Sequence, residues 1–285
     1  MFEDKRPKKW SQSYWNQINR NIGLVTFLEQ EQLREARITI LGQGGLGGPL
    51  TEQLARSGCE NLVICDNDKF EESNLNRQVC VRADIGKYKV DVVEKLIKNI
   101  NPEIKVCKYY EVNERNLLNI IEGSSVVALT LDDPIASILI SRKCRELKIL
   151  MLEAWAVPYL WAWWFTSESE DYETCYGFKT NKMTIPEIYQ SKSVLIDIKR
   201  QVLDKLTQFP EIISRYDREK GAIDGVISGN LPFISMAPLV RIAASYLTFE
   251  VIFSGILKIK RMILAPQIIG YDYFQSESIN FTFEM

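Results

Sequence analysis

A glycine-rich turn directly follows an apolar run near the start of the chain. Residues 37 to 41 read RITIL and residues 42 to 47 read GQGGLG, after which the pattern becomes helical. The glycines of the turn are Gly42, Gly44, Gly45 and Gly47. Glycine lets the backbone approach a phosphate closely, and free amides at a helix start attract the anion. The segment therefore predicts a strand, a phosphate-binding turn and a helix.

A carboxylate follows this turn at the spacing that nucleotide-binding βαβ units use. Asp66 ends the next apolar run, residues 62 to 65, and lies about 20 residues beyond the turn, where a carboxylate can accept hydrogen bonds from a ribose. The turn alone is a weak signal, because glycine loops also serve ordinary tight turns. Together with Asp66 it indicates a nucleotide site.

A second polar cluster, SNLNRQ at residues 73 to 78, favours ATP over NAD. It supplies Asn74, Arg77 and Gln78, and Lys89 follows at the start of a helical pattern. Arginine offers phosphate a bidentate fork, and lysine offers it a point charge. An NAD(P)-binding oxidoreductase is the alternative, but it would give these side chains no shared task. A third reading is an inactive partner subunit that keeps the nucleotide pocket.

Strand and helix patterns alternate over the first half of the chain. Strands are predicted near residues 37 to 42, 61 to 65, 104 to 109, 125 to 131 and 148 to 152, and helices near 45 to 57, 87 to 100, 114 to 122 and 134 to 146. The predicted fold class is α/β: a Rossmann-like, mostly parallel sheet with helices on both faces, continuing into antiparallel strands toward the C-terminus. Ligands of such sheets bind beyond the carboxyl ends of the strands.

We expect three segments. Residues 1 to 35 predict an N-terminal helical arm, with residues 10 to 35 helical. Residues 36 to 165 form the nucleotide-binding domain, and residues 166 to 285 pack with it as one unit. The last segment contains a helical insertion over residues 186 to 220, a glycine-rich loop over 221 to 229, a long helix over 236 to 258 and a closing hairpin. Trp155, Trp161, Trp163 and Trp164 alternate as in one long strand and are interpreted as core, with a ligand platform as the alternative.

The composition excludes several functions. The net charge of −2 gives no general attraction to nucleic acid or anionic membranes, and the charged first ten residues are unlike a signal peptide. We therefore expect a cytoplasmic protein without nucleic-acid or membrane partners. The chain has no histidine, which removes the usual general base and the commonest metal ligand. Any catalysis must depend on carboxylates, arginine, lysine and a bound metal.

These motifs occur in the order seen in the ThiF, MoeB and HesA proteins, relatives of the ubiquitin-activating enzymes, and the chain resembles that family. The shared motifs are the glycine turn and residues 66 to 68, 73 to 78, 84 to 89, 101 to 102 and 236 to 239. The similarity runs from about residue 16 to 152 and resumes more weakly from 230 to 273. It implies an adenylyltransferase that uses ATP and Mg²⁺ to activate the carboxylate of a small protein, peptide or small acid, releasing pyrophosphate.

The resemblance also implies roles for individual residues. The glycine turn would hold the phosphates and Asp66 the ribose, with Asn74, Arg77, Gln78 and Lys89 around the triphosphate. Asp132 would lie near Mg²⁺ and the reacting phosphate, although it could instead cap the helix that begins near Pro134. Arg20 resembles the arginine that family dimers insert into the partner's ATP site, which implies a homodimer. An intramolecular salt bridge is the alternative for Arg20.

Two departures from the family pattern affect the predicted chemistry. The family usually has Asn after the aspartate and Arg a few residues on, where this chain has Asp133 and Ser137, so the approach of the substrate carboxylate is expected to differ. Zinc-binding relatives use two CxxC pairs, and thioester-forming relatives place a cysteine in the crossover loop. This chain has neither, and Cys175 is the remaining candidate. We expect no zinc and no thioester. The 186 to 220 insertion is read as packed structure, with a lid or docking element as the alternative.

Overall fold

The computed structural model describes residues 5–156, 160–209 and 215–283, which fold around one eight-stranded sheet. The strands are β1 (Arg37–Leu41), β2 (Asn61–Cys65), β3 (Lys105–Tyr109), β4 (Val126–Leu129), β5 (Leu150–Trp155), β6 (Leu160–Phe165), β7 (Gln267–Asp272) and β8 (Glu277–Thr282). Their order across the sheet is β3-β2-β1-β4-β5-β6-β7-β8. Strands β1 to β5 pair in parallel, and β6 to β8 continue the sheet in antiparallel fashion.

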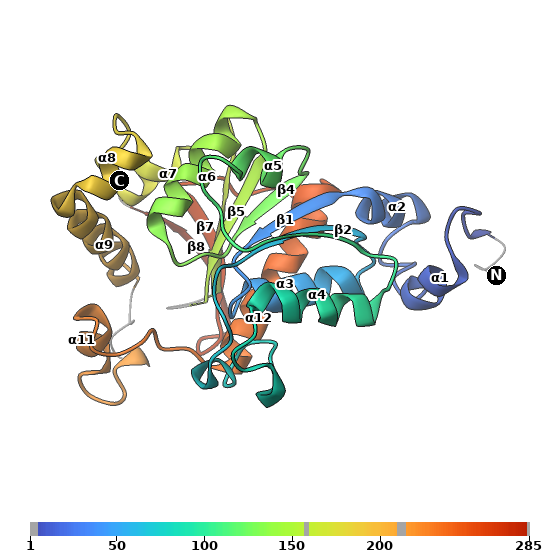
Figure 1. Ribbon diagram of the computed structural model, residues 1–285, viewed down its shortest axis with the longest axis horizontal. Helices are drawn as coiled ribbons and strands as arrows, with labels where there is room; N and C mark the ends of the chain where they lie inside the picture. Colours follow the sequence, from blue (N-terminus) through green and yellow to red (C-terminus); the bar gives the residue numbers. More distant parts are fainter. Residues whose placement is uncertain (1–4, 157–159, 210–214, 284–285) are drawn as a thin grey trace.

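Helices cover both faces of this sheet (Figure 1). The main helices are α1 (Gln12–Ile18), α2 (Phe27–Glu35), α3 (Gly47–Arg56), α4 (Lys89–Ile100), α5 (Leu117–Ile121), α6 (Pro134–Glu146), α7 (Tyr172–Tyr176), α8 (Ile185–Gln190), α9 (Lys192–Thr207), α11 (Ala222–Ile227) and α12 (Ala237–Phe249). One apolar core lies between the sheet and α3, α4 and α12, and another lies under α5 to α9. The predicted α/β class, with helices on both faces and antiparallel strands toward the C-terminus, is confirmed.

The N-terminal region differs from the single helical stretch predicted over residues 10 to 35. It contains two helices, because the chain turns at Gly23, whose φ is +118°. Thr26 then restarts the helix: its hydroxyl accepts a hydrogen bond from the Glu29 amide, and the Glu29 carboxylate accepts one from the Thr26 amide. This reciprocal cap fixes the start of α2.

The tryptophan-rich segment is a pair of strands rather than the one long strand predicted. β5 and β6 run antiparallel, with Met151 opposite Phe165 and Trp155 opposite Trp161. Both arrangements give the same alternation in sequence, so the pattern alone could not separate them. Trp161, Trp163 and Trp164 are each at most 2% exposed, which confirms their predicted role in the core.

The C-terminal elements follow the prediction with two changes. The glycine-rich loop over residues 221 to 229 contains the short helix α11, and the last turns of the long helix are π-helical over Glu250–Ile256. The span Ala237–Ile256 is long and apolar enough to cross a membrane, with a mean hydropathy of 1.5. Its most apolar window is 56% buried, and α12 packs on α3 and the sheet, as a core helix does.

The glycine turn after β1 requires glycine for steric reasons. Gly42 has a φ of +97°, and a Cβ there would lie 2.5 Å from the carbonyl oxygen of Thr130. A Cβ on Gly47 would lie 1.8 Å from the carbonyl oxygen of Gly42. The first turn of α3 therefore packs directly on the backbone of Gly42, just after β1, and Gly42 packs on the backbone of Thr130, just after β4.

Substitution of the turn glycines tests this packing. We expect Gly47→Ala to lower the free energy of unfolding by about 3 kcal/mol, because backbone atoms must move to admit the methyl group. Gly45→Ala is the control: its Cβ would meet Val240 at 3.5 Å and Arg77 at 3.7 Å, which are ordinary contacts. We expect the control to change stability by less than about 0.5 kcal/mol in denaturant titrations. Equal effects of the two substitutions would contradict this account.

Candidate active site

The candidate site lies at the carboxyl ends of β2, β1 and β4, which are neighbours in the sheet. The helices after β1 and β4 cover opposite faces, so the chain diverges here. In open α/β sheets a ligand crevice is expected beyond the strand ends at such a point. Backbone hydrogen bonds connect the three ends: the Gly42 amide donates to Cys65 at 2.8 Å, and the Thr130 amide donates to Leu41 at 2.8 Å. The Thr130 hydroxyl also donates to the Gly42 carbonyl at 2.9 Å.

Asp66 fastens the glycine turn to the end of β2. Its Oδ2 accepts the Gln43 amide at 2.6 Å, and its Oδ1 accepts the Asp68 amide at 2.8 Å. Burial raises the pKa of the Asp66 carboxyl, and the nearby Lys89 ammonium opposes that rise. Asp66 is thus placed beside the turn as predicted, and it also has a structural task there.

Lys89 is a buried cation at the first residue of α4. Its side chain is 9% exposed, and its Nζ pairs with Oδ2 of Asp68 at 2.7 Å. A cation at a helix start lies at the positive end of the helix dipole and needs an anion beside it. Asp68 supplies one, and its carboxylate, with 60% of its side chain exposed, is the solvent-facing member of the pair.

The 73 to 78 cluster covers the glycine turn. The Arg77 side chain lies next to Gly45, with its Nη1 donating to the Ser73 carbonyl at 3.1 Å and to Oδ1 of Asn76 at 2.8 Å. The Gln78 side chain is buried next to Gly44, and its Oε1 has no hydrogen-bond partner in the described part of the chain. A buried polar atom without a partner is costly, so it marks a place for a polar ligand. The Gln78 oxygen can only accept, so it suits a hydroxyl or amino group of a ligand, whereas the cationic side chains of Arg77 and Lys89 suit its phosphates.

Asn74 has a local role as well as a place in the cluster. It is buried, and its Oδ1 accepts the Glu71 amide at 3.2 Å, which closes the short turn Glu72–Asn74. Its Nδ2 lies 3.3 Å from the Ser73 hydroxyl. The side chain therefore shapes the loop that carries Arg77 and Gln78.

The two aspartates after β4 have different tasks. Asp133 caps α6: its Oδ1 accepts the amides of Ile135 at 2.9 Å and Ala136 at 3.2 Å. The capping alternative for Asp132 is therefore wrong. Asp132 is exposed, two residues beyond Thr130, and its side chain makes no hydrogen bond or ion pair with the residues described here.

Arg20 lies far from this crevice in its own chain. The neighbouring Asn21 donates to the carbonyl of Ser57 at 3.2 Å, at the end of α3 opposite to the glycine turn. α3 has 10 residues and therefore spans about 15 Å. Arg20 is exposed and forms no ion pair within the described ranges, so the structure does not show the intramolecular salt bridge considered above.

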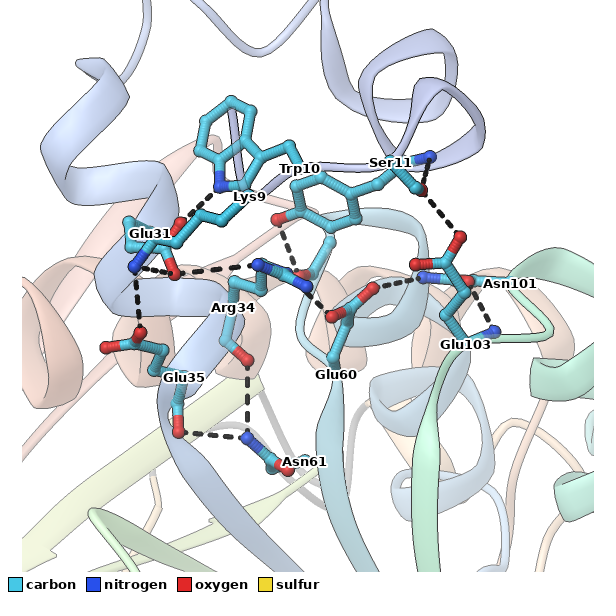
Figure 2. Close-up of polar contacts among 12 residues, drawn as sticks. Lys9, Trp10, Ser11, Glu31, Arg34, Glu35, Glu60, Asn61, Asn101 and Glu103 are labelled. Carbon is cyan, nitrogen blue, oxygen red and sulfur yellow. Dashed lines mark hydrogen bonds and ion pairs between the residues drawn. The ribbon is translucent and has the colours of Figure 1, made fainter. Parts of the chain in front are cut away.

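The segment before Arg20 is held to α2, which is itself paired with the residue before β2, and to the loop before β3. Lys9 pairs with Glu31 at 2.9 Å, Arg34 pairs with Glu60 at 2.7 Å, and the Trp10 indole donates to Glu31 (Figure 2). The Ser11 hydroxyl also donates to Glu103 at 2.6 Å. These contacts fix α1, so the exposed Arg20 at its end projects from a well-held support.

Two further features lie outside the crevice. Cys175 is completely buried, and burial raises the pKa of its thiol to about 12. A cavity of 540 Å³ lies between α6, α7 and the strands β5 and β6, near the amino end of β5. The arginines that line it are already bound: Arg142 pairs with Glu173 at 2.7 Å, and Arg145 donates to the Ser169 carbonyl at 2.9 Å.

Sequence reasoning did not select Asp68 or Thr130 as site residues. Asp68 holds Lys89, and Thr130 connects β4 to the glycine turn. Their positions could have indicated a role, because Asp68 lies two residues after Asp66 and Thr130 lies two residues before Asp132, both at strand ends. At the carboxyl ends of β1, β2 and β4, the structure brings together Gly42, Gly44, Gly45, Gly47, Asp66, Arg77, Gln78 and Lys89. Arg20 does not belong to this group.

Comparisons of sequence place the chain among known proteins. It is 39% identical over 117 residues to a probable molybdopterin-synthase adenylyltransferase of Gracilaria tenuistipitata var. liui. The aligned stretch covers 40% of this chain and 33% of the relative. It is 33% identical over 118 residues to the SAMP-activating enzyme E1 of Haloferax volcanii, covering 41% of this chain and 44% of that one. The matched stretches thus span a third to less than half of these relatives.

Comparisons of structure extend over nearly the whole chain. PaaA superposes with a TM-score of 0.68 and 21% identity, covering 97% of this chain and 85% of that one. E. coli MccB with AMPCPP and MccA superposes with a TM-score of 0.66 and 20% identity, and the match covers 99% of this chain and 75% of the MccB chain. At these identities the likeness shows the fold. The sequence also matches the ThiF family over residues 16–284, and the chain therefore belongs to the ThiF family.

Proposed function

We propose that this protein is an ATP-dependent adenylyltransferase that activates the carboxylate of a small protein, a peptide or a small acid. The observation that carries the proposal is that Arg77, the Lys89–Asp68 pair and the Gln78 Oε1, which finds no partner among the described residues, lie around one glycine turn. Relatives named molybdopterin-synthase adenylyltransferase and SAMP-activating enzyme E1, and MccB solved with ATP, support it.

The proposed reaction suits a chain without histidine. One carboxylate oxygen of the substrate forms a bond to the α-phosphorus of ATP, and the bond from that phosphorus to the β-phosphate bridging oxygen breaks, releasing pyrophosphate. The nucleophile is already ionised at neutral pH, so no general base is needed. Arg77 and Lys89 would offset the negative charge of the triphosphate as the pyrophosphate departs. The glycine-turn amides would hold the phosphates, and Asp66 the ribose.

Asp132 is proposed as the magnesium ligand. Among the described residues, no three His, Cys, Asp or Glu side chains converge to hold a metal ion. Mg²⁺ commonly binds through one or two carboxylates together with substrate phosphates and waters, and Asp132 has a free carboxylate for that purpose. When bound, the ion would supply charge stabilisation at the reacting phosphate.

We further propose that the acyl-adenylate passes directly to its acceptor, without zinc or an enzyme thioester. The chain has no CxxC pair and no cysteine after Cys175. The Cys175 thiol is buried with a raised pKa, and such a thiol is a poor nucleophile near neutral pH.

Exchange of labelled pyrophosphate into ATP tests the proposed function. A panel of candidate peptides, small-protein C-termini and small acids is added with ATP and Mg²⁺. We expect exchange that depends on one class of carboxylate and disappears when that carboxylate is amidated. Exchange that survives amidation, or tight NAD binding by a protein that does not bind ATP, would refute the proposal.

The adjacent aspartates provide a matched pair of variants. We expect Asp132→Ala to lower the exchange rate by about 100-fold or more, because the metal loses its protein ligand, with the melting temperature unchanged. Asp133→Ala should cost about 1 kcal/mol of stability through the lost helix cap and keep most of the exchange activity. Exchange assays and thermal unfolding read the two effects separately. Full activity in Asp132→Ala would contradict the assignment.

We also propose a homodimer in which Arg20 completes the partner's site, since it cannot reach its own crevice. Co-purified Arg20→Ala and Asp132→Ala chains test this, because one site of each mixed dimer has both residues intact. We expect each variant alone to be nearly inactive and the mixture to recover about a quarter of wild-type activity. A mixture as inactive as its components, despite mixed dimers in native mass spectra, would contradict the cross-subunit role.

A further inference from the structure

One side of α12 is apolar and exposed, and the proposed reaction gives it no role. The most apolar window of the span Ala237–Ile256 is 56% buried, so a large part of this apolar helix lies outside the core. Ile242 is 40% exposed and Phe249 is 55% exposed, and the two lie about two helical turns apart on the same side. A surface helix normally presents polar side chains to water, so an apolar outer side indicates contact with another molecule.

A groove continues this apolar side at the end of α12. It has a volume of 200 Å³ and lies between the last turns of the helix, the end of α3 and the segment from residue 21 to residue 33. Leu33 and Ile252 line it and are buried, whereas Phe249 and Leu24 line it and are more than half exposed. The face therefore has a hollow with apolar walls and exposed apolar side chains beside that hollow.

A face with both features can be complementary to a second copy of itself. In a two-fold dimer the same patch serves both subunits, so an exposed side chain of one subunit can fill the hollow of the other. Leu24 and Phe249 are the candidates for this contact, because each is exposed at the rim of the groove that it lines.

The middle of the exposed side carries a small residue. Ser245 follows Ile242 by three residues and precedes Phe249 by four, so the three share one side of the helix. The Ser245 hydroxyl donates to the Arg241 carbonyl at 2.9 Å and needs no further acceptor when it is buried. A small side chain lets two helices approach closely. If two copies of α12 cross antiparallel at Ser245, Ile242 of each copy lies beside Phe249 of the other, as a two-fold interface requires.

The direction of α12 fits an antiparallel partner. At its start, a Cβ on Gly45 of the glycine turn would lie 3.5 Å from the Val240 side chain. At its end, Phe249 shares the groove with Asn21, the residue after Arg20. The 13 residues of the helix span about 20 Å between these ends. An antiparallel partner helix therefore brings its Arg20 end toward the glycine turn of this chain, and the reverse holds by symmetry.

We propose that the exposed side of α12 and the groove at its end form the homodimer interface, with the two α12 helices crossing antiparallel near Ser245. The inference rests on the homodimer proposed above, and it locates the contact surface and the route by which Arg20 reaches the partner's site. A membrane or a different protein could also cover the apolar face, but neither would bring a second Arg20 to the glycine turn.

Sedimentation velocity of the full chain tests the interface without any substrate. Ile242→Arg and Phe249→Arg each place a guanidinium in the contact on both subunits, so we expect each to weaken dimerisation by about 100-fold or more. Leu118→Arg is the matched control, because Leu118 is 45% exposed on α5, which covers the opposite face of the sheet. The control should be as dimeric as the wild type. Circular dichroism verifies that each variant is folded.

Cysteine cross-linking tests the crossing point. A two-fold axis near residue 245 brings the two thiols of Ser245→Cys within reach of a disulfide bond. Cys107 is exposed and the other five cysteines are buried, so all chains in this test also carry Cys107→Ser. After oxidation with copper phenanthroline, we expect most of the Ser245→Cys chain to form a covalent dimer on non-reducing gels. Leu118→Cys should remain a single chain.

Pyrophosphate exchange connects the interface to the site. We expect Phe249→Arg to lower exchange about as far as Arg20→Ala does, and Leu118→Arg to keep wild-type exchange. Full exchange by a monomeric Phe249→Arg would contradict the delivery of Arg20 across this face.

Three results would overturn the proposal whether or not exchange is found. They are a wild-type monomer, alone or bound to phosphatidylcholine vesicles, arginine variants as dimeric as Leu118→Arg, and no more covalent dimer from Ser245→Cys than from Leu118→Cys. A wild type that dimerises and cross-links as expected but shows no exchange would support the interface and defeat the adenylyltransferase function.

Discussion

The site depends on one close backbone contact, between the glycine turn after β1 and the segment after β4. Gly47 packs on the Gly42 carbonyl, and Gly42 packs on Thr130, at distances that leave no room for a side chain. This contact places the amino end of α3, the Asp66 carboxylate and the turn with Asp132 together at the carboxyl ends of β1, β2 and β4. The charged side chains of the candidate site have their positions because the ends of β1, β2 and β4 are in contact there.

Much of this arrangement could be predicted from local sequence. The glycine turn, the spacing to Asp66 and the alternation of strand and helix patterns are properties of short segments, and they gave the parallel half of the sheet correctly. The adjacent Asp132 and Asp133 could not be separated, because only the backbone at the start of α6 decides which side chain turns inward to cap it. The orphaned acceptor of Gln78 and the pairing of Lys89 with Asp68 also depend on contacts between elements, which no local pattern encodes.

The second half of the chain shows the same limit. The tryptophan alternation fits one long strand or two paired ones, and the choice depends on Trp155 meeting Trp161 across the sheet. That pairing also creates the setting of Glu153, a buried carboxyl of β5, since Trp163 and the α7 tyrosines close around it from separate elements. Ser137, which in sequence is a departure from a family pattern, is buried in the structure, and its hydroxyl donates to the Asp133 carbonyl at the start of α6.

The central claim is that this crevice holds a nucleoside triphosphate. Isothermal titration of the protein with ATP and Mg²⁺, and separately with NAD, tests it without knowledge of the substrate. We predict saturable heat with ATP and Mg²⁺ that is strongly reduced in Arg77→Ala, and no heat with NAD. Saturable binding of NAD without a response to ATP would contradict the account.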